Sequence, residues 1–376
     1  MNSNSNNNPK VIAFYLPQYH PISENDEWWG KGFTEWTNVG RAKPLFKGHY
    51  QPRVPADLGY YDLRLSETRI AQADLAKKHG VDGFCYYHYW FGNGKRLLER
   101  PFNEVLSSGD PDFPFMLCWA NESWHSKFWD YNGVSQKKLL IEQVYGQEKE
   151  YEAHFYSLLN SFKDKRYIKI DGKPAFMIYE SLKFPDVENF IKVWQKLAVE
   201  NGIIGIHFIG QTQNSENDKG TIISKGFDAI NAVRIHNVLQ KKNKIKRVIS
   251  KTWRTVFQSA LKEEYSKAIH YFTNTSFDKA QDVYPTIVPN WDHTPRSGKK
   301  GFLLHNSNPE NFSVHVNNVF NVLKEKPGAK QICFLKSWNE WAEGNYMEPD
   351  LKYGTKYLEV LKTEKDKMKE INSNII

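Results

Sequence analysis

The segment SETRIAQADLAKKHGVDGFCYYHYW, residues 66–90, contains a helix followed directly by a strand, and this pair decides the fold class. Residues 66–79 have helical spacing, with Ser66 suited to cap the N-terminus and Gly80 suited to end the helix. Residues 81–87 form a short apolar, aromatic-rich run, which predicts a buried strand. A helix that leads into a buried strand is the repeating unit of α/β proteins.

The same alternation covers most of the chain. Further strands are predicted at residues 11–16, 115–119, 175–179, 204–209 and 332–335, and further helices at 147–162, 187–201 and 309–324. This order predicts a parallel sheet. A closed barrel fits better than a doubly wound sheet, because no glycine-rich dinucleotide-binding turn follows the first strand. The predicted fold is therefore α/β, a TIM-like barrel whose long βα loops form the substrate face.

The domain organisation is simple. We predict one barrel domain, residues 10–361, between a disordered N-terminal tail, residues 1–9, and a charged C-terminal tail, residues 362–376, that frays. No internal repeat or linker marks a second domain. The segment between Pro17 and Leu65 is too long for an ordinary βα loop, so we expect it on the substrate face.

The aromatic content is high. Phe, Trp and Tyr make up 15% of the 376 residues, and 12 residues are tryptophan. Trp and Tyr combine a flat apolar face with a polar tip, which suits stacking on sugar rings. A large barrel core also uses bulky side chains, so composition leaves the two interpretations balanced.

The cysteines and the N-terminal residues indicate in which cellular compartment the protein is expected. Cys85, Cys118 and Cys333 lie far apart in apolar runs, which indicates buried free thiols in a reducing compartment. Residues 1–8 are polar and lack the apolar core of a secretory signal. No stretch reaches the roughly 18 apolar residues of a membrane span. We therefore expect a soluble, cytoplasmic protein.

The formal charge of +8 is partly local. The run KKNKIKRVISKTWR, residues 241–254, carries seven basic residues and no acidic one. Such a run is most often a solvated helix or loop. The alternative is weak contact with anionic lipid headgroups or a phosphate-bearing glycan. Nucleic acid is not an expected partner.

Polar and aromatic side chains gather where four predicted strands end. The carboxyl ends of barrel strands converge on one face, so these side chains are expected to share a substrate site. The candidates are Tyr15, Gln18 and His20, then Tyr86, Tyr87 and Trp90, then Trp119, Asn121, Glu122 and Trp124, and finally Trp338, Asn339 and Trp341.

Glu340 and Glu343 are the candidate catalytic pair, in SWNEWAEG, residues 337–344. Glycosidic cleavage in its usual form uses two carboxyl groups, one of which protonates the leaving oxygen. On an extended strand the two would point to opposite faces. The strand must therefore end near Glu340 and the chain must turn toward Glu343, which Gly344 permits.

We expect Trp338 and Trp341 to wall this site and lower its dielectric, which raises a carboxyl pKa toward the range of an acid catalyst. An isolated Glu-x-x-Glu is more often two exposed surface residues. The position at an aromatic-lined strand end favours the catalytic interpretation.

Other candidates lie in the long loops, namely Glu35, Trp36, His49, Trp291 and Asp292. Glu35 and Glu122 each neighbour a tryptophan and could bind sugar hydroxyls or hydrogen-bond a loop. His20 and His49 are as readily structural as substrate-binding. Asp292 and Arg296 are interpreted as an ion pair that shapes the rim, in preference to the alternative of direct contact with the substrate. The 12 histidines show no metal-ligand spacing, so neither a metal nor a cofactor is expected.

At these motifs the chain resembles a known family. The segments that carry the resemblance are FYLPQYHPISENDEWWGKGFTEWTNVGRAKPLFKGHYQPRVP, DGFCYYHYWFGNGKRLLERPFNEVL, FPFMLCWANESW, YIKIDGKPAFMIY, NWDHTPR and SWNEWAEGNYMEPD. They span residues 11 to about 360. The chain is identified as similar to the WbsX family, which is often labelled glycosyltransferase and is related to glycoside hydrolase family 99.

The resemblance implies a (β/α)8 barrel and the chemistry of retaining endo-α-mannosidases. Carried over by position, Glu340 removes the proton of the sugar 2-hydroxyl, which attacks the anomeric carbon to give a 1,2-anhydro sugar. Glu343 protonates the leaving group and then activates water. The chain departs from family 99 at Ala342, where the mannosidases usually have histidine, and in an unfamiliar segment from 237 to 271.

The transferase label implies a nucleotide-sugar donor site, either a Rossmann-like cleft or a metal-binding Asp-x-Asp, and neither is expected here. The preferred function is therefore cleavage of α-mannoside-type or rhamnoside-type linkages in a polysaccharide or lipid-linked oligosaccharide. The alternatives are a glycosyltransferase or transglycosylase in surface polysaccharide synthesis, and a non-catalytic glycan-binding barrel. Linkage, endo or exo action and oligomeric state stay open.

Overall fold

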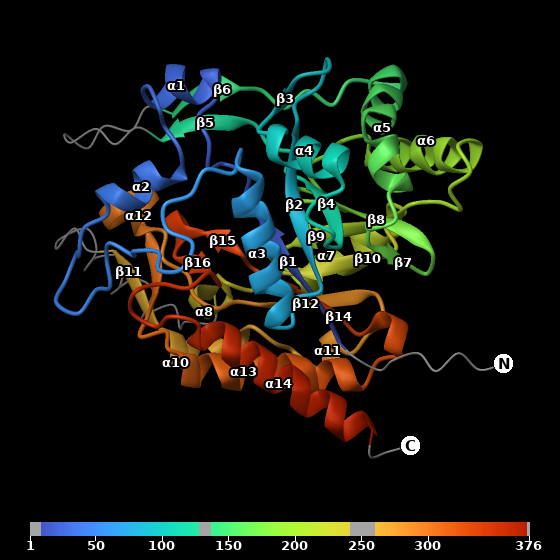
Figure 1. Ribbon diagram of the computed structural model, residues 1–376. Helices are drawn as coiled ribbons and strands as arrows, with labels where there is room; N and C mark the ends of the chain where they lie inside the picture. Colours follow the sequence, from blue (N-terminus) through green and yellow to red (C-terminus); the bar gives the residue numbers. More distant parts are fainter. Residues whose placement is uncertain (1–8, 128–136, 241–259, 374–376) are drawn as a thin grey trace.

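The computed structural model describes residues 9–127, 137–240 and 260–373. Parallel strands form a closed barrel surrounded by helices (Figure 1). The barrel strands are β1 (Lys10–Tyr15), β2 (Gly83–Trp90), β4 (Phe115–Trp119), β8 (Lys173–Ile178), β9 (His207–Thr212), β10 (Ala229–Ala232), β12 (Val283–Ile287) and β14 (Ile332–Leu335).

The strands pair in chain order, and the first closes on the last. Val11 of β1 lies opposite Cys333 of β14, and Phe14 of β1 lies opposite Cys85 of β2. These strands are buried along almost their whole length, which explains their nearly continuous apolar sequences. The architecture is a (β/α)8 barrel, as predicted.

Helices pack around the barrel. The longer ones are α3 (Ser66–Lys78), α4 (Arg100–Ser108), α5 (Glu148–Lys163), α6 (Val187–Glu200), α7 (Ser215–Ser224), α13 (Pro309–Lys324) and α14 (Lys356–Ser373). Local sequence explains their ends. At α13, Pro309 opens the helix and the Asn308 side chain accepts a 2.8 Å hydrogen bond from the amide of Asn311. Among the described residues after β10 are the short helices α8 (Asn237–Gln240), α10 (Tyr265–Ala268) and α11 (Thr275–Asp278).

Most predicted elements are confirmed within a few residues. Ser66 is the first residue of α3 rather than its cap, which is Leu65. β9 begins at His207, three residues later than predicted, because Gly205 adopts a positive φ before it. Strands β10 and β12 were not predicted, because each is a short apolar run inside an irregular region.

The predicted C-terminal tail, residues 362–376, is corrected. Helix α14 continues to Ser373. Lys365 is buried, where its Nζ donates to the carbonyl of Gly80 at 2.7 Å and pairs with Asp82. Met368 is also buried, so this segment packs on the barrel rather than fraying. The predicted tail at 1–9 lies outside the described residues except for Pro9, and the basic run 241–254 lies wholly outside them.

Short elements collect at the carboxyl ends of the strands. They include α1 (Ser23–Trp29) and α2 (Glu35–Arg41) from the long first insert, α12 (Thr294–Ser297), and the hairpin of β5 (Trp124–Lys127) with β6 (Lys137–Ile141). In Figure 1 these labels lie on the left or upper left, away from both chain ends. The long first insert thus lies on this face, as predicted.

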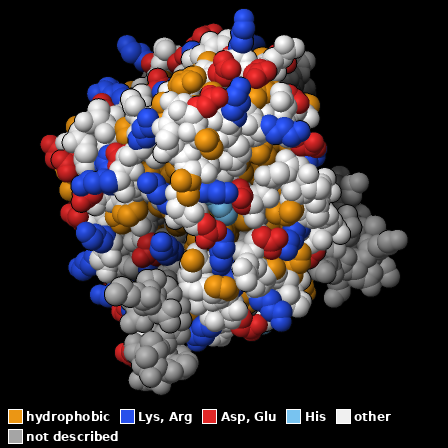
Figure 2. All heavy atoms as spheres, turned by 90° about the vertical axis from the view of Figure 1, so that its right-hand side faces the viewer, with side chains coloured by type: hydrophobic (Ala, Val, Ile, Leu, Met, Phe, Trp, Pro, Cys, Tyr) orange, Lys and Arg blue, Asp and Glu red, His pale blue; other side chains and the backbone are white. Residues whose placement is uncertain are grey.

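The three cysteines are buried free thiols, as predicted. Within the described segments, no helix combines the length and apolar character needed to cross a membrane. Figure 2 shows one face of the molecule, on which acidic and basic side chains are interspersed and hydrophobic ones are scattered.

Candidate active site

A large cleft of about 1320 Å³ opens among the loops that follow the barrel strands. Carboxylates, cations and aromatic rings all line it. The lining includes Glu35, Glu122, Glu180, Glu340 and Glu343; Arg41, Lys183, Arg296, Lys300 and Lys336; His125, His236 and His293; and Trp28, Trp29, Phe33, Tyr87, Tyr89, Trp124, Tyr145, Tyr179, Trp291 and Phe302. Flat rings with a few converging polar groups are typical of a site for a sugar chain.

Glu340 and Glu343 reach this cleft from one tight turn. β15 (Asn339–Glu340) ends at Glu340, a single 3-10 turn covers Trp341–Glu343, and Gly344 has φ +58°. A Cβ at Gly344 would lie 2.7 Å from the Asp292 Cβ, so the close packing as well as the backbone conformation requires glycine. The predicted strand end and glycine turn are confirmed.

Hydrogen bonds from neighbouring loops fix the turn. The Asn339 side chain accepts from the amide of Leu16 at 2.7 Å and donates to the Leu16 carbonyl at 3.0 Å. The amide of Asp292 donates to the Glu343 carbonyl at 2.5 Å. The catalytic candidates are therefore anchored to the end of β1 and to the loop after β12.

The two tryptophans of the motif do not wall the cleft, contrary to prediction. Trp338 is fully buried and packs on Phe84. Trp341 is buried against Tyr346, with ring centroids 3.8 Å apart, and its Nε1 donates to Glu348 at 2.6 Å. Both side chains therefore support the turn from behind.

Glu340 is a buried carboxyl beside a buried cation. Its Oε2 lies 3.8 Å from Lys336 Nζ, and Lys336 donates a 3.0 Å hydrogen bond to the Tyr87 hydroxyl. Burial raises the pKa of Glu340, Lys336 opposes the rise, and Glu343 adds to it, so that the pKa reaches about 7. A carboxyl with this pKa exchanges protons readily near neutral pH.

Glu343 belongs to a different charge cluster. Arg296 donates to Glu343 through Nη1 and to Glu35 through Nε, at 2.9 Å, and Nη2. His293 Nε2 lies 3.6 Å from Glu343 Oε1. Burial lowers the pKa of Arg296, but the two carboxylates outweigh this and raise it, so the guanidinium stays charged. This cation favours the ionised form of Glu343.

The predicted Asp292–Arg296 ion pair is therefore wrong. Asp292 is fully buried and accepts 2.8 Å hydrogen bonds from His49 and Gln51 instead. Burial raises the pKa of Asp292, but the lowering effects of His49 and Arg53 contribute to a net shift below the ordinary value. Asp292 is therefore an ionised residue that supports the turn of Glu340 and Glu343 from behind.

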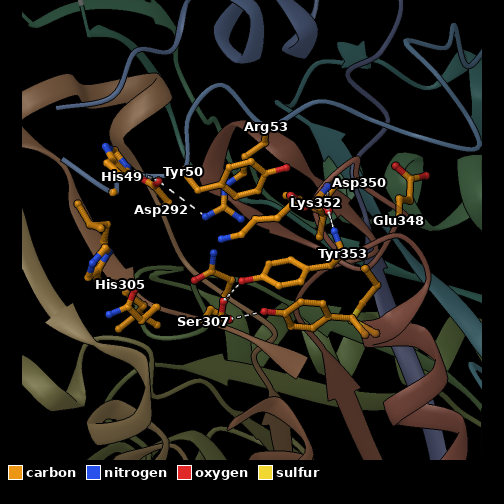
Figure 3. Close-up of a pocket in the computed structure, with 18 of the residues that line it drawn as sticks. His49, Tyr50, Arg53, Asp292, His305, Ser307, Glu348, Asp350, Lys352 and Tyr353 are labelled. Carbon is orange, nitrogen blue, oxygen red and sulfur yellow. Dashed lines mark hydrogen bonds and ion pairs between the residues drawn. The ribbon is translucent and has the colours of Figure 1, made fainter. Parts of the chain in front are cut away.

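A small pocket of about 50 Å³ lies next to Asp292, which is part of its lining (Figure 3). In the figure Arg53 and Asp292 face each other, 3.8 Å apart between Nη2 and Oδ2. Arg53 also lies over the Tyr346 ring. The pocket is narrow and has polar side chains such as Arg53 and Asp292 in its lining, so it suits water rather than a sugar.

Beyond the glutamate pair, the predicted residues that line the cleft are Gln18, Glu35, Tyr87, Asn121, Glu122, Trp124 and Trp291. Asn121 has an amide that is already occupied. It donates to Tyr145 at 3.1 Å and to the Glu180 carbonyl at 3.2 Å, and accepts from the Glu180 amide at 2.8 Å. Asn121 therefore ties two loops together at the cleft edge.

The other predicted residues lie outside the cleft, a correction to their placement. They are Tyr15, His20, Trp36, His49, Tyr86, Trp90, Trp119, Asp292, Trp338, Asn339 and Trp341. For several of these residues, the alternation of side chains along a strand explains why they lie outside the cleft. The Tyr15 hydroxyl donates to Gln72 of α3, and Trp90 Nε1 donates to Glu150 of α5. These rings point outward to the helices.

Several lining residues were missed. Tyr89 could have been found, because it lies two positions after Tyr87 on the same strand and therefore on the same face. Lys336 also carried a signal, as a charged residue directly after the buried strand β14. Tyr179 carried the same signal, directly after the buried strand β8, whereas the inward positions of Tyr145, His236 and His293 depend on loop paths that short-range patterns do not define.

The described part of the chain bears on metal binding and on a nucleotide-sugar donor site. No group of three or more His, Cys, Asp or Glu side chains there is arranged to hold a metal. An Asp-x-Asp does occur, contrary to expectation, at Asp110–Pro111–Asp112. It precedes β4, at the opposite end of the barrel strands from the cleft.

Comparisons with known proteins agree with this architecture. Residues 11–361 match the family described as glycosyltransferase WbsX. The chain is 35% identical over 356 residues to the uncharacterized protein WxcX of two Xanthomonas campestris strains, which covers 93% of this chain and 48% of the relative. The chain thus spans about half the length of these curated relatives.

Solved structures share the fold at low sequence identity. A glycoside hydrolase-like protein matches with a TM-score of 0.57 and 15% identity, over 96% of this chain and 95% of the other. A family 99 endo-α-mannosidase from Bacteroides thetaiotaomicron matches with a TM-score of 0.56 and 15% identity, over 96% and 98%.

Proposed function

The chain belongs to the WbsX family, and on this premise we propose that it is a glycan-processing enzyme of the glycoside hydrolase type. The carrying observation is that Glu340 and Glu343 line one aromatic-rich cleft from a single rigid turn. We propose α-mannoside-type or rhamnoside-type linkages as the target, cleaved with retention through a 1,2-anhydro sugar.

In this proposal Glu340 is the base. Its pKa of about 7 makes it a stronger base than an ordinary carboxylate, while still partly ionised at neutral pH. Lys336, 3.8 Å away, stabilises the ionised form. Glu340 takes the proton of the sugar 2-hydroxyl, O2 attacks C1, and the bond from C1 to the leaving oxygen breaks. This route needs a 2-hydroxyl trans to the leaving group, as in α-mannosides and α-rhamnosides.

Glu343 serves the other side of the reaction. It gives its proton to the leaving oxygen and then removes a proton from the water that opens the anhydro ring at C1. Glu340 returns its proton to O2. The second step suits the ionised Glu343 that Arg296 favours. The first step requires Glu343 to be protonated, which Arg296 opposes.

The contact between Arg296 and Glu343 also supports a second candidate, transfer to an acceptor hydroxyl in place of water. An ionised Glu343 could activate a sugar hydroxyl as readily as water. A transglycosylase would use the same intermediate, whereas a nucleotide-sugar transferase would need a donor site. Stabilisation of the protein by a nucleotide in a thermal-shift screen would favour the latter.

The roles can be separated with two leaving groups on one sugar. Glu343→Gln should lose most activity on an oligosaccharide and recover in part on an activated aryl glycoside, which needs little acid help. Glu340→Gln should abolish activity on both. Equal loss on both substrates in Glu343→Gln would contradict the acid role.

A further inference from the structure

Arg296 lies partly exposed between two more deeply buried carboxylates. Its side chain is 25% exposed and lines the cleft, whereas those of Glu35 and Glu343 are 2% and 11% exposed. The guanidinium therefore presents part of its surface to the cleft while its donors hold carboxylates behind it. Guanidinium groups bind carboxylate and phosphate oxygens well, so a third oxyanion could compete for the same donors.

The lining of the whole cleft is balanced in charge, but the part formed by α2 and by the residues that follow Arg296 carries an excess of cations. Lys300 follows Arg296 in the same loop, and Arg41 comes from the end of α2, and both line the cleft. Neither forms an ion pair with an acidic side chain within the described segments. Three cations (Arg41, Arg296 and Lys300) thus face two carboxylates (Glu35 and Glu343). Elsewhere on the cleft, Lys183 is paired with Glu180 at 2.8 Å.

We propose that the substrate carries an oxyanion on the leaving-group side of the scissile bond, and that Arg296 binds it. This inference rests on the proposed function, in which Glu343 serves the leaving group. Arg296 contacts Glu343, so it lies on that side. An oxyanion that draws Arg296 away from Glu343 removes a neighbouring cation that opposes protonation of Glu343.

Two sources supply this chemistry. A carboxylate on the leaving sugar, as in a uronic acid, would be bound by Arg296 while Glu343 protonates the leaving oxygen. Alternatively, the leaving group is itself a phosphate. The bond from C1 to the phosphate oxygen then breaks with its electron pair on the phosphate, O2 bonds to C1, and the O2 proton goes to Glu340. That leaving group needs no proton from Glu343.

The direct test is the binding of inorganic phosphate, measured by calorimetry at constant ionic strength. Arg296→Met should weaken binding by at least about tenfold, the size of one charge-assisted hydrogen bond. Glu343→Gln should tighten it, because Arg296 loses a charged internal competitor. Lys183→Met is the matched control, a cleft lysine with its own acidic partner, and should leave phosphate binding unchanged.

Two results would overturn the inference. One is phosphate binding that is equal in the wild type and Arg296→Met, including an absence of binding in both. The other is weaker binding in Glu343→Gln, which would mean that Arg296 needs Glu343 rather than competing with it. Arg296→Met leaves the Glu35 charge buried and could fail to fold, so the double variant Glu35→Gln/Arg296→Met provides the same test without that charge.

Activity distinguishes the sources. Rates are compared on three substrates that share one glycone and differ in the leaving group, which is a neutral sugar, a uronic acid or phosphate. The wild type should prefer one anionic form, and Arg296→Met should lose that preference. Equal rates on all three substrates would overturn the inference and leave the proposed function standing. No turnover of any of them, with Arg296-dependent phosphate binding intact, would overturn the proposed function and leave the anion site.

Discussion

Lys336 Nζ lies 3.8 Å from Glu340 Oε2, and both side chains are more than nine-tenths buried. Glu340 Oε2 has no hydrogen-bond partner within the described residues. The charge of Lys336 is therefore a principal means by which the protein controls when Glu340 ionises.

Lys336→Met should raise the pKa of Glu340 above its value of about 7. A base acts when ionised, so the rise of kcat/KM with pH should move to higher pH. Lys336 also contacts the Tyr87 hydroxyl, so Tyr87→Phe is the control and should shift the profile less. A profile that stays in place or moves to lower pH in Lys336→Met would contradict this electrostatic account.

Glu340 should also make stability depend on pH. Its pKa is about 7 in the folded protein against an ordinary 4.5. The raised pKa means that a contribution fully present below pH 4.5 is lost as pH rises through 7. The difference amounts to about 3 kcal/mol at most, from 1.36 kcal/mol per pKa unit. Glu340→Gln should therefore gain stability relative to the wild type between pH 5 and pH 8.5.

Urea unfolding at several pH values measures this difference. Glu348 is also buried with its pKa raised to about 7, but it is present in both proteins, so the comparison isolates Glu340. A stability difference that is constant with pH would show that Glu340 does not titrate in this range.

Gly344→Ala should damage the catalytic turn. A Cβ would lie 2.7 Å from the Asp292 Cβ, on a residue with φ +58°. Gly354, with φ +54° and open space around it, is the matched control, since alanine there meets only the backbone cost of about 1 kcal/mol. Thermal unfolding should show a larger loss for Gly344→Ala, together with a fall in kcat. Equal losses in the two variants would mean that the turn can relax.

Glu348→Gln should loosen the turn from behind. Glu348 accepts from Trp341, at 2.6 Å, from Gln72, at 2.6 Å, and from Tyr61, at 2.8 Å. An amide replaces one acceptor oxygen with a donor, which should cost about 1–3 kcal/mol. Tyr61→Phe removes a single donor and should cost less. Denaturant unfolding near pH 4.5, where the raised pKa of Glu348 keeps its carboxyl protonated in the folded protein, measures both without removing a buried charge, and no loss in Glu348→Gln would contradict this role.

The barrel could be predicted from sequence because its strands and helices have distinct periodicities. Strands β10 and β12 were not predicted because they are only four and five residues long and each includes a polar residue, which gives too weak a signal. The end of helix α14 was predicted to be a frayed tail because most of its residues are charged and only a few pack against the barrel. Lys365 is buried, and its ammonium group contacts the Gly80 carbonyl and the Asp82 carboxylate, two partners that the local sequence does not indicate.

The site was predictable where chemistry and strand position coincide, as for Glu340 and Glu343. It was less predictable where the direction of a side chain determines whether the residue lines the cleft. Trp90 and Tyr87 belong to the same strand, but only Tyr87 points into the cleft. The partner of Arg296 could not be chosen from its neighbour Asp292, because Glu35 and Glu343 approach it from distant loops.

The central claim is that this pair of glutamates acts on a glycan without an activated donor. The direct measurement is incubation with a panel of α-mannan and α-rhamnan oligosaccharides, without nucleotide sugar, read by mass spectrometry. We predict shortened products with the wild type and none with Glu340→Gln. No cleavage, with product formed only when a nucleotide sugar is added, would contradict the account and establish a transferase.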